Sequence, residues 1–268
     1  MTPIARELLA PSLAPFGRSS TLPAGAYTDE AVFRWEQEHF FDRSWVCVGR
    51  AADGNLGRNG RSSDPPRVTE WHGWLFVNSK GNAPPFGEHA GNLEALILNY
   101  GCEQLVVAAS HHYEVAANWK VLAENYHECY HCSSIHPELC EVSPPTSGGD
   151  NLEPEGAWIG GPMSLYDGVE TMSLDGKSYA PNLPNLAQGE DRTVHYFQLF
   201  PNLLISPHPD YVLTHRLTPL APDLTAVECE WLFSREATKS EGFDPSYASE
   251  FWVITYRQDW HACESVQR

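Results

Sequence analysis

Residues 118–137 read N-W-K-V-L-A-E-N-Y-H-E-C-Y-H-C-S-S-I-H-P and place three histidines and two glutamates within twenty positions. Such a density of imidazole and carboxylate groups is typical of a metal site, because these groups repel one another as they gain protons but bind a divalent cation together. Imidazole and carboxylate ligands that leave open positions are the set found in non-haem Fe(II) sites. The segment therefore predicts a metal centre.

The spacing of the two outer histidines predicts a break in the local helix. We expect a helix over residues 119–130, with Glu128 and His131 on one face. His136 would lie about 140° further round, so a straight helix could not aim both histidines at one ion. The helix should therefore end or unwind near Cys132. The proline after His136 agrees, because it disfavours the α conformation in the residue that precedes it.

A second motif lies within the same residues. His127 to His131 reads H-E-x-x-H, the helix of zinc metalloproteases, in which two histidines bind zinc and the glutamate is the general base. The longer form of this motif needs Gly and a third His at the positions that Ser134 and Pro137 occupy here. A zinc protease that uses His127, Glu128 and His131 therefore stays as an alternative of lower rank.

The full pattern N-W-K-x-x-x-E-N-Y-x-E-x-Y-H-x-x-x-x-H-P resembles the iron-site signature of the Rieske-type non-haem iron oxygenases, in the catalytic domain of their large subunit. The resemblance implies that His131 and His136 bind a mononuclear Fe(II) ion. It implies that Glu128 carries electrons from a Rieske cluster and that Asn125 lies near the iron. His127 then becomes a neighbour of the site.

A third ligand must come from elsewhere, and the C-terminal run that contains Gln-Asp-Trp at residues 258–260 is the candidate. It resembles the closing helix of the same family, which implies that Asp259 is the metal carboxylate. The pattern agrees, because a helix here would leave Asp259 on a mostly apolar stripe, where a carboxylate is costly unless it is paired or metal-bound. The other members of that stripe are Trp252, Thr255, Tyr256 and Cys263.

Composition excludes several function classes. The 268 residues are 42% hydrophobic and 12% aromatic, which is ample for a core. The formal charge of −18 argues against nucleic acid or an anionic membrane as a partner. Seven unpatterned cysteines, without a signal peptide or a long apolar run, suggest a reducing cytoplasm, with most of the cysteines acting as small buried hydrophobic residues.

The resemblance breaks where a Rieske domain should follow. Residues 1–53 read as an arm, a helix from Thr28 to about residue 41, and a strand that leads towards such a domain. A Rieske [2Fe-2S] cluster needs C-x-H and C-x-x-H pairs, and the sequence contains no C-x-x-H. We therefore expect residues 54–66 to be the junction of a missing Rieske domain, by natural deletion, engineering or a joined sequence.

Residues 67–268 read as the catalytic domain, for which we expect a C-terminal truncation because the last helical pattern lacks a stop signal. The fold class that we predict is α+β, a curved antiparallel sheet packed on helices. The family implies the same helix-grip-like fold. The elements that we expect are strands at 67–78, 104–117, 193–206, 211–219 and 225–234, a helix at 93–100, a loop at 144–188 and the C-terminal helix.

The resemblance implies O₂-dependent hydroxylation or N-demethylation in a homotrimer that receives electrons from a reductase or ferredoxin. The Glu-Cys-Tyr-His-Cys run at 128–132 resembles the branch that oxidises choline, betaine and carnitine, so we expect a quaternary or methylated amine as substrate. An aromatic-ring dioxygenase is the alternative substrate class. A non-catalytic subunit is the alternative from outside the enzymes, because the cluster ligands are absent from the sequence.

Overall fold

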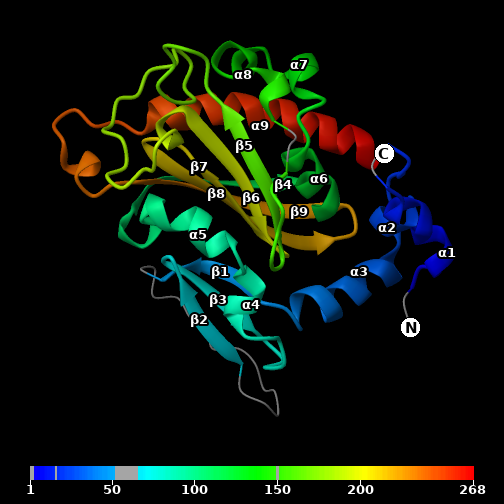
Figure 1. Cartoon of the computed structure of the whole chain (residues 1–268). Helices are drawn as coiled ribbons and strands as arrows, with labels where there is room; N and C mark the ends of the chain where they lie inside the picture. The colour runs from blue at the N-terminus through cyan, green and yellow to red at the C-terminus, as the bar shows by residue number, and fades with distance from the viewer. Residues whose placement is uncertain (1–2, 16, 52–65, 149–150) are drawn as a thin grey trace.

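The computed structural model describes residues 3–15, 17–51, 66–148 and 151–268. In these residues two antiparallel sheets lie one above the other (Figure 1). The small sheet has the order β1 (Val46–Arg50), β3 (Trp74–Asn78), β2 (Arg67–Trp71). The large sheet has the order β4 (Val106–Val115), β9 (Leu224–Phe233), β8 (Tyr211–Ala221), β7 (Leu203–Pro207), β6 (Thr193–Leu199), β5 (Trp158–Ser164).

The helices are short except for the last one. They are α1 (Arg6–Leu9), α2 (Gly25–Thr28), α3 (Glu30–Glu36), α4 (Phe86–Ala90), α5 (Leu93–Ile97), α6 (Trp119–His127), α7 (Cys132–Ile135), α8 (Pro137–Val142) and α9 (Ser246–Gln267). Within the described part of the chain, none combines the length and the apolar character that a membrane span requires. The predicted α+β class is confirmed.

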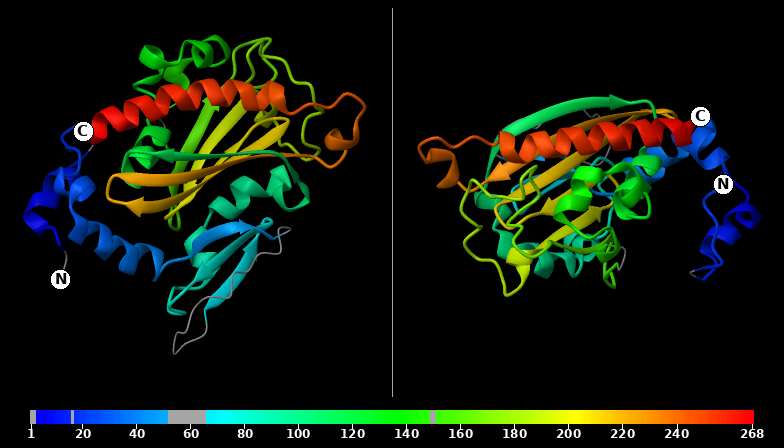
Figure 2. Two further views of the ribbon diagram at one scale, coloured as in Figure 1. Left: turned by 180° about the vertical axis from the view of Figure 1, so that it is seen from behind. Right: turned by 90° about the horizontal axis from the view of Figure 1, so that it is seen from above.

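The side chains of the central strands point alternately to the two faces of the large sheet and so contribute to two separate core layers. On β8, Tyr211 and Leu213 belong to the core that also holds α6 and α9, whereas Val212 belongs to the core shared with the small sheet and α5. Successive side chains of a strand point to opposite faces, so the large sheet is buried on both sides. Figure 2 shows α9 crossing one face of the large sheet while the small sheet lies beyond the other.

Several sequence expectations need correction in detail. Asp29, and not Thr28, caps α3, because its carboxylate accepts a hydrogen bond from the Ala31 amide. The single strand expected at 67–78 is a hairpin, since both His72 and Gly73 adopt positive φ angles of 46° and 86° and form its two-residue turn. The expected junction at 54–66 lies outside the described residues apart from its last position.

Two further expectations concern the large sheet. The strand expected at 193–206 is two strands, β6 and β7, which pair with each other. The loop expected at 144–188 contains β5, the edge strand that pairs with β6 along its whole length. This strand was missed because its two glycines and its proline weaken the alternating pattern by which strands are recognised. The helix at 93–100 and the strands at 104–117, 211–219 and 225–234 are confirmed to within a few residues.

A buried ion pair ties the N-terminal helix α3 to α6. Glu36 and Lys120 are only 4% and 9% exposed, and their charged atoms lie 2.8 Å apart. The indole nitrogen of Trp119 donates a second hydrogen bond to the Glu36 carboxylate at 3.0 Å. Burial lowers the pKa of Lys120, although the contact with Glu36 opposes this shift. The charge of Lys120 therefore depends on one partner that comes from outside α6.

Replacement of Glu36 by glutamine keeps the shape of the side chain but removes its charge. We expect Glu36→Gln to lower the free energy of unfolding in urea by about 3 kcal/mol, because breaking a buried pair leaves an uncompensated charge. The double variant Glu36→Gln/Lys120→Met should recover most of the loss. Glu30→Gln is the matched control, since Glu30 pairs with Arg34 on the exposed face of the same helix. Equal effects of the two glutamine variants would contradict the expectation.

Candidate metal centre

The helix α6 sets the first boundary of the centre. The Asn118 side chain caps it by accepting a hydrogen bond from the Lys120 amide, and its buried face packs into the core. It ends at His127, because Glu128 adopts an extended conformation and its carboxylate accepts from the Tyr130 amide. The helix predicted for residues 119–130 is therefore too long, and Glu128 does not share a helical face with His131.

Two short helices then position the histidines. His131 immediately precedes α7, and His136 lies between α7 and α8 with φ of −117° and ψ of 68°. Pro137 occupies the first position of α8, where its missing N–H costs nothing. The break expected near Cys132 lies earlier, since α6 ends at His127 and α7 begins at Cys132, whereas the expected departure of His136 from the α conformation is confirmed. This conformation turns the two imidazole rings towards each other, with centroids 5.1 Å apart.

The C-terminal helix α9 brings the carboxylate to this pair. Oδ1 of Asp259 lies 2.9 Å from Nε2 of His136 and 3.5 Å from Nε2 of His131. The side chain of Asp259 is 14% exposed. The three residues that the sequence singled out as ligands therefore meet, although 123 positions separate His136 from Asp259.

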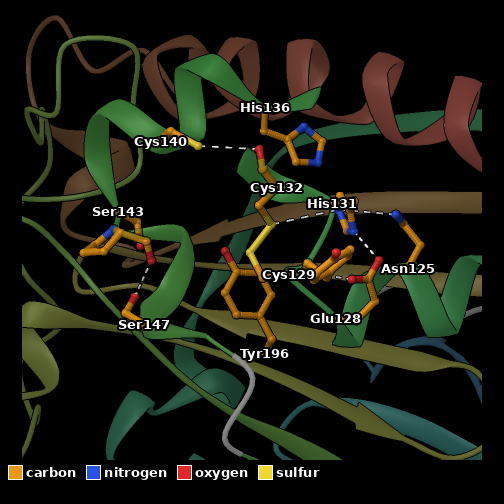
Figure 3. Close-up of a disulfide and its surroundings, with 12 residues drawn as sticks. Asn125, Glu128, Cys129, His131, Cys132, His136, Cys140, Ser143, Ser147 and Tyr196 are labelled. Atoms are coloured by element: carbon orange, nitrogen blue, oxygen red, sulfur yellow. Dashed lines mark hydrogen bonds and ion pairs between the residues drawn. A yellow bond between two sulfur atoms is a disulfide. The ribbon is translucent and has the colours of Figure 1, made fainter. Parts of the chain in front are cut away.

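The outer nitrogens of both histidines have acceptors of their own. Nδ1 of His136 lies 2.7 Å from Oε1 of Gln258, and Nδ1 of His131 contacts Oε1 of Glu128. A neutral imidazole that donates its Nδ1–H outward presents the Nε2 lone pair inward. Figure 3 shows the contacts of His131 with the Glu128 carboxylate and with the Asn125 amide as dashed lines. Asn125 lies 3.4 Å from Nε2 of His131, so this expected neighbour is also at the centre.

The charges at the centre compensate one another. Burial raises the pKa of Asp259, but the hydrogen bonds from His131 and His136 outweigh it and hold that pKa below its ordinary value. Burial lowers the pKa of His131, but Asp259 and Glu128 together raise it above the ordinary value. The carboxylate therefore stays ionised, and the His131 imidazole beside it is drawn towards its charged form.

The donor set fits a divalent metal ion. Two inward-facing imidazole nitrogens and one carboxylate oxygen form the two-histidine, one-carboxylate set of non-haem Fe(II) sites. Each imidazole also has the outward hydrogen bond that usually orients a metal-bound histidine. Within the described residues, His131 and His136 also belong to a cluster of possible ligand atoms that includes Cys132.

His127 does not belong to this cluster. Its Nε2 lies 3.2 Å from Oε1 of Gln198, and burial lowers its pKa to about 4, which keeps the ring neutral. Since α6 ends at His127, the two histidines of the H-E-x-x-H motif do not lie on successive turns of one helix. The zinc protease alternative therefore lacks the geometry that its motif requires.

A further pair of histidines, His111 and His112, lies on β4 outside the centre. His111 and His112 are neighbours on β4 and point to opposite faces. His111 packs against Trp231, and the exposed His112 pairs with Glu228. Neither reaches the centre.

Two features of the centre were not foreseen. The Gln258 side chain contacts Nδ1 of His136 and fixes the orientation of that ring, whereas the sequence had indicated only the neighbouring Asp259. Cys129 and Cys132 form a disulfide that spans His131, whereas the cysteines were expected to be small hydrophobic residues. The C-x-x-C spacing in the sequence is the signal that could have indicated it. The other five cysteines are free, as expected.

A cavity of about 100 Å³ opens beside the centre. All the candidate site residues line it, namely Asn125, Glu128, His131, His136 and Asp259. Its other walls are mostly apolar and aromatic, and the aromatic residues are Tyr126, Tyr196, Trp252, Tyr256 and Trp260. A small ligand in this cavity would therefore contact both the metal ligands and several aromatic side chains.

Comparisons with known proteins connect this arrangement to two oxygenases. The chain is 28% identical over 247 residues to the glycine betaine monooxygenase oxygenase subunit of Chromohalobacter salexigens, a match that covers 81% of this chain and 54% of the relative. The chain thus spans about half the length of that relative. It is 23% identical to the carnitine monooxygenase oxygenase subunit of Escherichia coli, with coverages of 92% and 83%.

Comparison with solved structures agrees on the fold. A quaternary ammonium Rieske monooxygenase superposes with a TM-score of 0.72 at 19% identity, covering 92% of this chain and 84% of the other. Residues 102–268 match the family model described as the ring hydroxylating alpha subunit, catalytic domain. This range holds every candidate ligand and the whole of the large sheet. The chain therefore belongs to the family of ring-hydroxylating alpha subunits and carries its catalytic domain.

Proposed function

We propose that the chain is the mononuclear-iron catalytic part of an oxygenase that hydroxylates or N-demethylates a small methylated amine. The observation that carries the proposal is the meeting of Nε2 of His131, Nε2 of His136 and Oδ1 of Asp259 beside a cavity. When bound there, Fe(II) would supply open positions for O₂ next to the substrate. Asn125 and the aromatic walls would position the substrate and limit the access of water.

Electrons must reach this centre from another source. The sequence lacks the C-x-x-H pair of a Rieske cluster, while the alignment to the carnitine relative runs over 331 positions, more than the 268 residues of this chain. We propose that a cluster carried by a separate protein, such as a ferredoxin, delivers them. Glu128 is suited to receive them, since its side chain is 48% exposed and contacts His131.

The cavity supports a cationic substrate. Its lining includes two carboxylates and five aromatic rings, and no lysine or arginine occurs among the described residues that form it. The faces of aromatic rings attract quaternary ammonium groups, and the Glu128 carboxylate, which is not a proposed metal ligand, adds to that attraction. The two relatives named above are described as acting on glycine betaine and carnitine. The same apolar walls would also accept an aromatic ring, which keeps a ring-hydroxylating dioxygenase as the second candidate.

Iron binding tests the centre itself. Protein loaded without air should hold about one Fe(II) ion per chain, as a single two-histidine, one-carboxylate site predicts. His131→Ala and Asp259→Ala should each abolish binding, as measured by metal analysis after removal of free iron. His127→Ala is the matched control and should retain the iron, because His127 contacts Gln198. Loss of stoichiometric metal in the control, with zinc bound in the parent protein, would favour the protease motif.

Glu128 could either orient His131 or transfer electrons, and a measurement of iron affinity distinguishes the two roles. If its carboxylate orients His131, then Glu128→Ala should weaken Fe(II) binding about 10 to 100-fold, the usual effect of removing such a partner. Glu128→Gln should recover much of the affinity, because its amide oxygen can still accept from Nδ1. Unchanged affinity in Glu128→Ala would rule out the orienting role and leave electron transfer as the role of this residue.

A matched pair of ligands tests the substrate class. Choline and its neutral isostere 3,3-dimethylbutan-1-ol differ in one charge. We expect choline to quench the tryptophan fluorescence of the iron-loaded protein at a concentration at least about tenfold lower, because cation–π contacts in a desolvated site contribute on the order of 1–2 kcal/mol. Trp260→Leu should reduce this difference.

Equal affinities for the pair, with tighter binding of a neutral aromatic ring, would favour the dioxygenase. The iron-loaded protein should also consume O₂ in proportion to the amine when a reductase and a ferredoxin are supplied. Binding without such consumption would identify a non-catalytic subunit.

A further inference from the structure

The disulfide between Cys129 and Cys132 encloses the ligand His131. Cys132 is buried at 4% exposure, and its Sγ lies 3.9 Å from Nε2 of His131, the nitrogen that faces the centre. The possible ligand atoms of His131, Cys132 and His136 all lie within 4.8 Å of one another. Figure 3 shows the disulfide directly beside the His131 ring. A sulfur atom therefore lies beside the point at which the two histidines would bind a metal.

The bonding state of this sulfur decides whether it can be a ligand. A metal binds the thiolate form of cysteine, and the sulfur of a disulfide has no such charge. While Cys132 is bonded to Cys129, the centre offers two imidazoles and one carboxylate. Once the disulfide is reduced, the same centre offers two imidazoles, one carboxylate and one thiolate.

The second set fits a different metal. Four ligands of this kind form the closed tetrahedral site of zinc, and thiolate strongly favours zinc over Fe(II). A tetrahedral zinc ion places neighbouring nitrogen, oxygen and sulfur ligands about 3.3 to 3.8 Å apart. The distances in the structure are 2.9 Å from His136 to Asp259, 3.5 Å from His131 to Asp259 and 3.9 Å from Cys132 to His131. These three separations lie within about half an ångström of that range, and the sulfur of Cys132, once released from Cys129, would have to turn towards Asp259 to complete the tetrahedron.

We propose that the Cys129–Cys132 disulfide selects the metal: the oxidised chain presents the open site for Fe(II), and the reduced chain presents a closed zinc site made by His131, Cys132, His136 and Asp259. The inference rests on the proposed iron centre and adds a second occupant to it. A closed zinc site has no open position for O₂ or substrate, so the reduced, zinc-bound chain is inactive.

The switch needs a two-electron reductant, for which a small dithiol suffices. Its thiolate attacks Sγ of Cys129, which is half-buried and lines the cavity, and the S–S bond breaks with Cys132 leaving as a thiolate. The second thiol of the reductant then attacks the mixed disulfide and releases Cys129, which takes up a proton. The reductant ends as a disulfide, and the Cys132 thiolate binds zinc.

Cobalt(II) is a spectroscopic probe for this thiolate. Metal-free protein is compared in its oxidised form and after treatment with a dithiol that is removed by gel filtration. We expect a near-ultraviolet sulfur-to-cobalt band in the reduced form alone, and zinc binding more than about 100-fold tighter than in the oxidised form, since loss of even an outer partner of a ligand costs 10 to 100-fold.

Single substitutions distinguish the roles of Cys129 and Cys132. Cys129→Ser frees Cys132 permanently and should give the band and tight zinc binding without any reductant. Cys132→Ser should give neither under any condition. Cys140→Ser is the matched control and should behave as the parent protein, because Cys140 is a free cysteine outside the ligand cluster.

Three results would overturn the proposal. They are equal zinc affinity in reduced parent and Cys132→Ser protein, absence of the cobalt band in Cys129→Ser, and seven titratable thiols in the oxidised, denatured parent in place of five. Failure of the oxidised parent to bind Fe(II) would instead overturn the proposed function, and the cobalt band of Cys129→Ser would still report whether the thiolate binds metal.

Discussion

The contact between His136 and Asp259 is the constraint on which the site depends, because it joins two segments that neither local helix formation nor sequence proximity brings together. It requires α9 to lie across the large sheet, where its apolar face packs on Leu213 and Trp231. Burial there is costly for a carboxylate. The cost is offset because two imidazoles face Asp259. The helix can therefore pack in this position only if the histidines of the centre are in place.

Much of the centre could be predicted from the sequence because its determinants are local. The spacing of His131 and His136 in the sequence excludes a continuous helix, and Pro137 keeps His136 out of the α conformation. Asp259 is implied by the resemblance of the Gln-Asp-Trp run to the closing helix of the family, and its place on a mostly apolar helical stripe agrees with that role. The strands β8 and β9 could also be predicted from local sequence. Each is a run of strand-forming residues with turn residues at its ends.

The rest could not be predicted because it depends on contacts between distant segments or on small backbone choices. The end of α6 at His127 depends on Glu128, whose carboxylate bonds a backbone amide and the imidazole of His131 in place of continuing the helix. The turn at His72 requires a positive φ that histidine rarely adopts. The edge strand β5 is specified by its pairing with β6, which no local pattern shows.

The spacing of two histidines and an aspartate does not by itself select a metal, because the same three ligands serve an open iron site and part of a closed zinc site. The residues around these three ligands select the metal. Glu128 and Gln258 take the outer nitrogens and turn both lone pairs inward, which serves either metal. The fourth ligand distinguishes them, and Cys132 either supplies that ligand or withholds it in a bond with Cys129. Since that bond changes with the redox state of the surroundings, the identity of the bound metal becomes a property of the environment as well as of the fold.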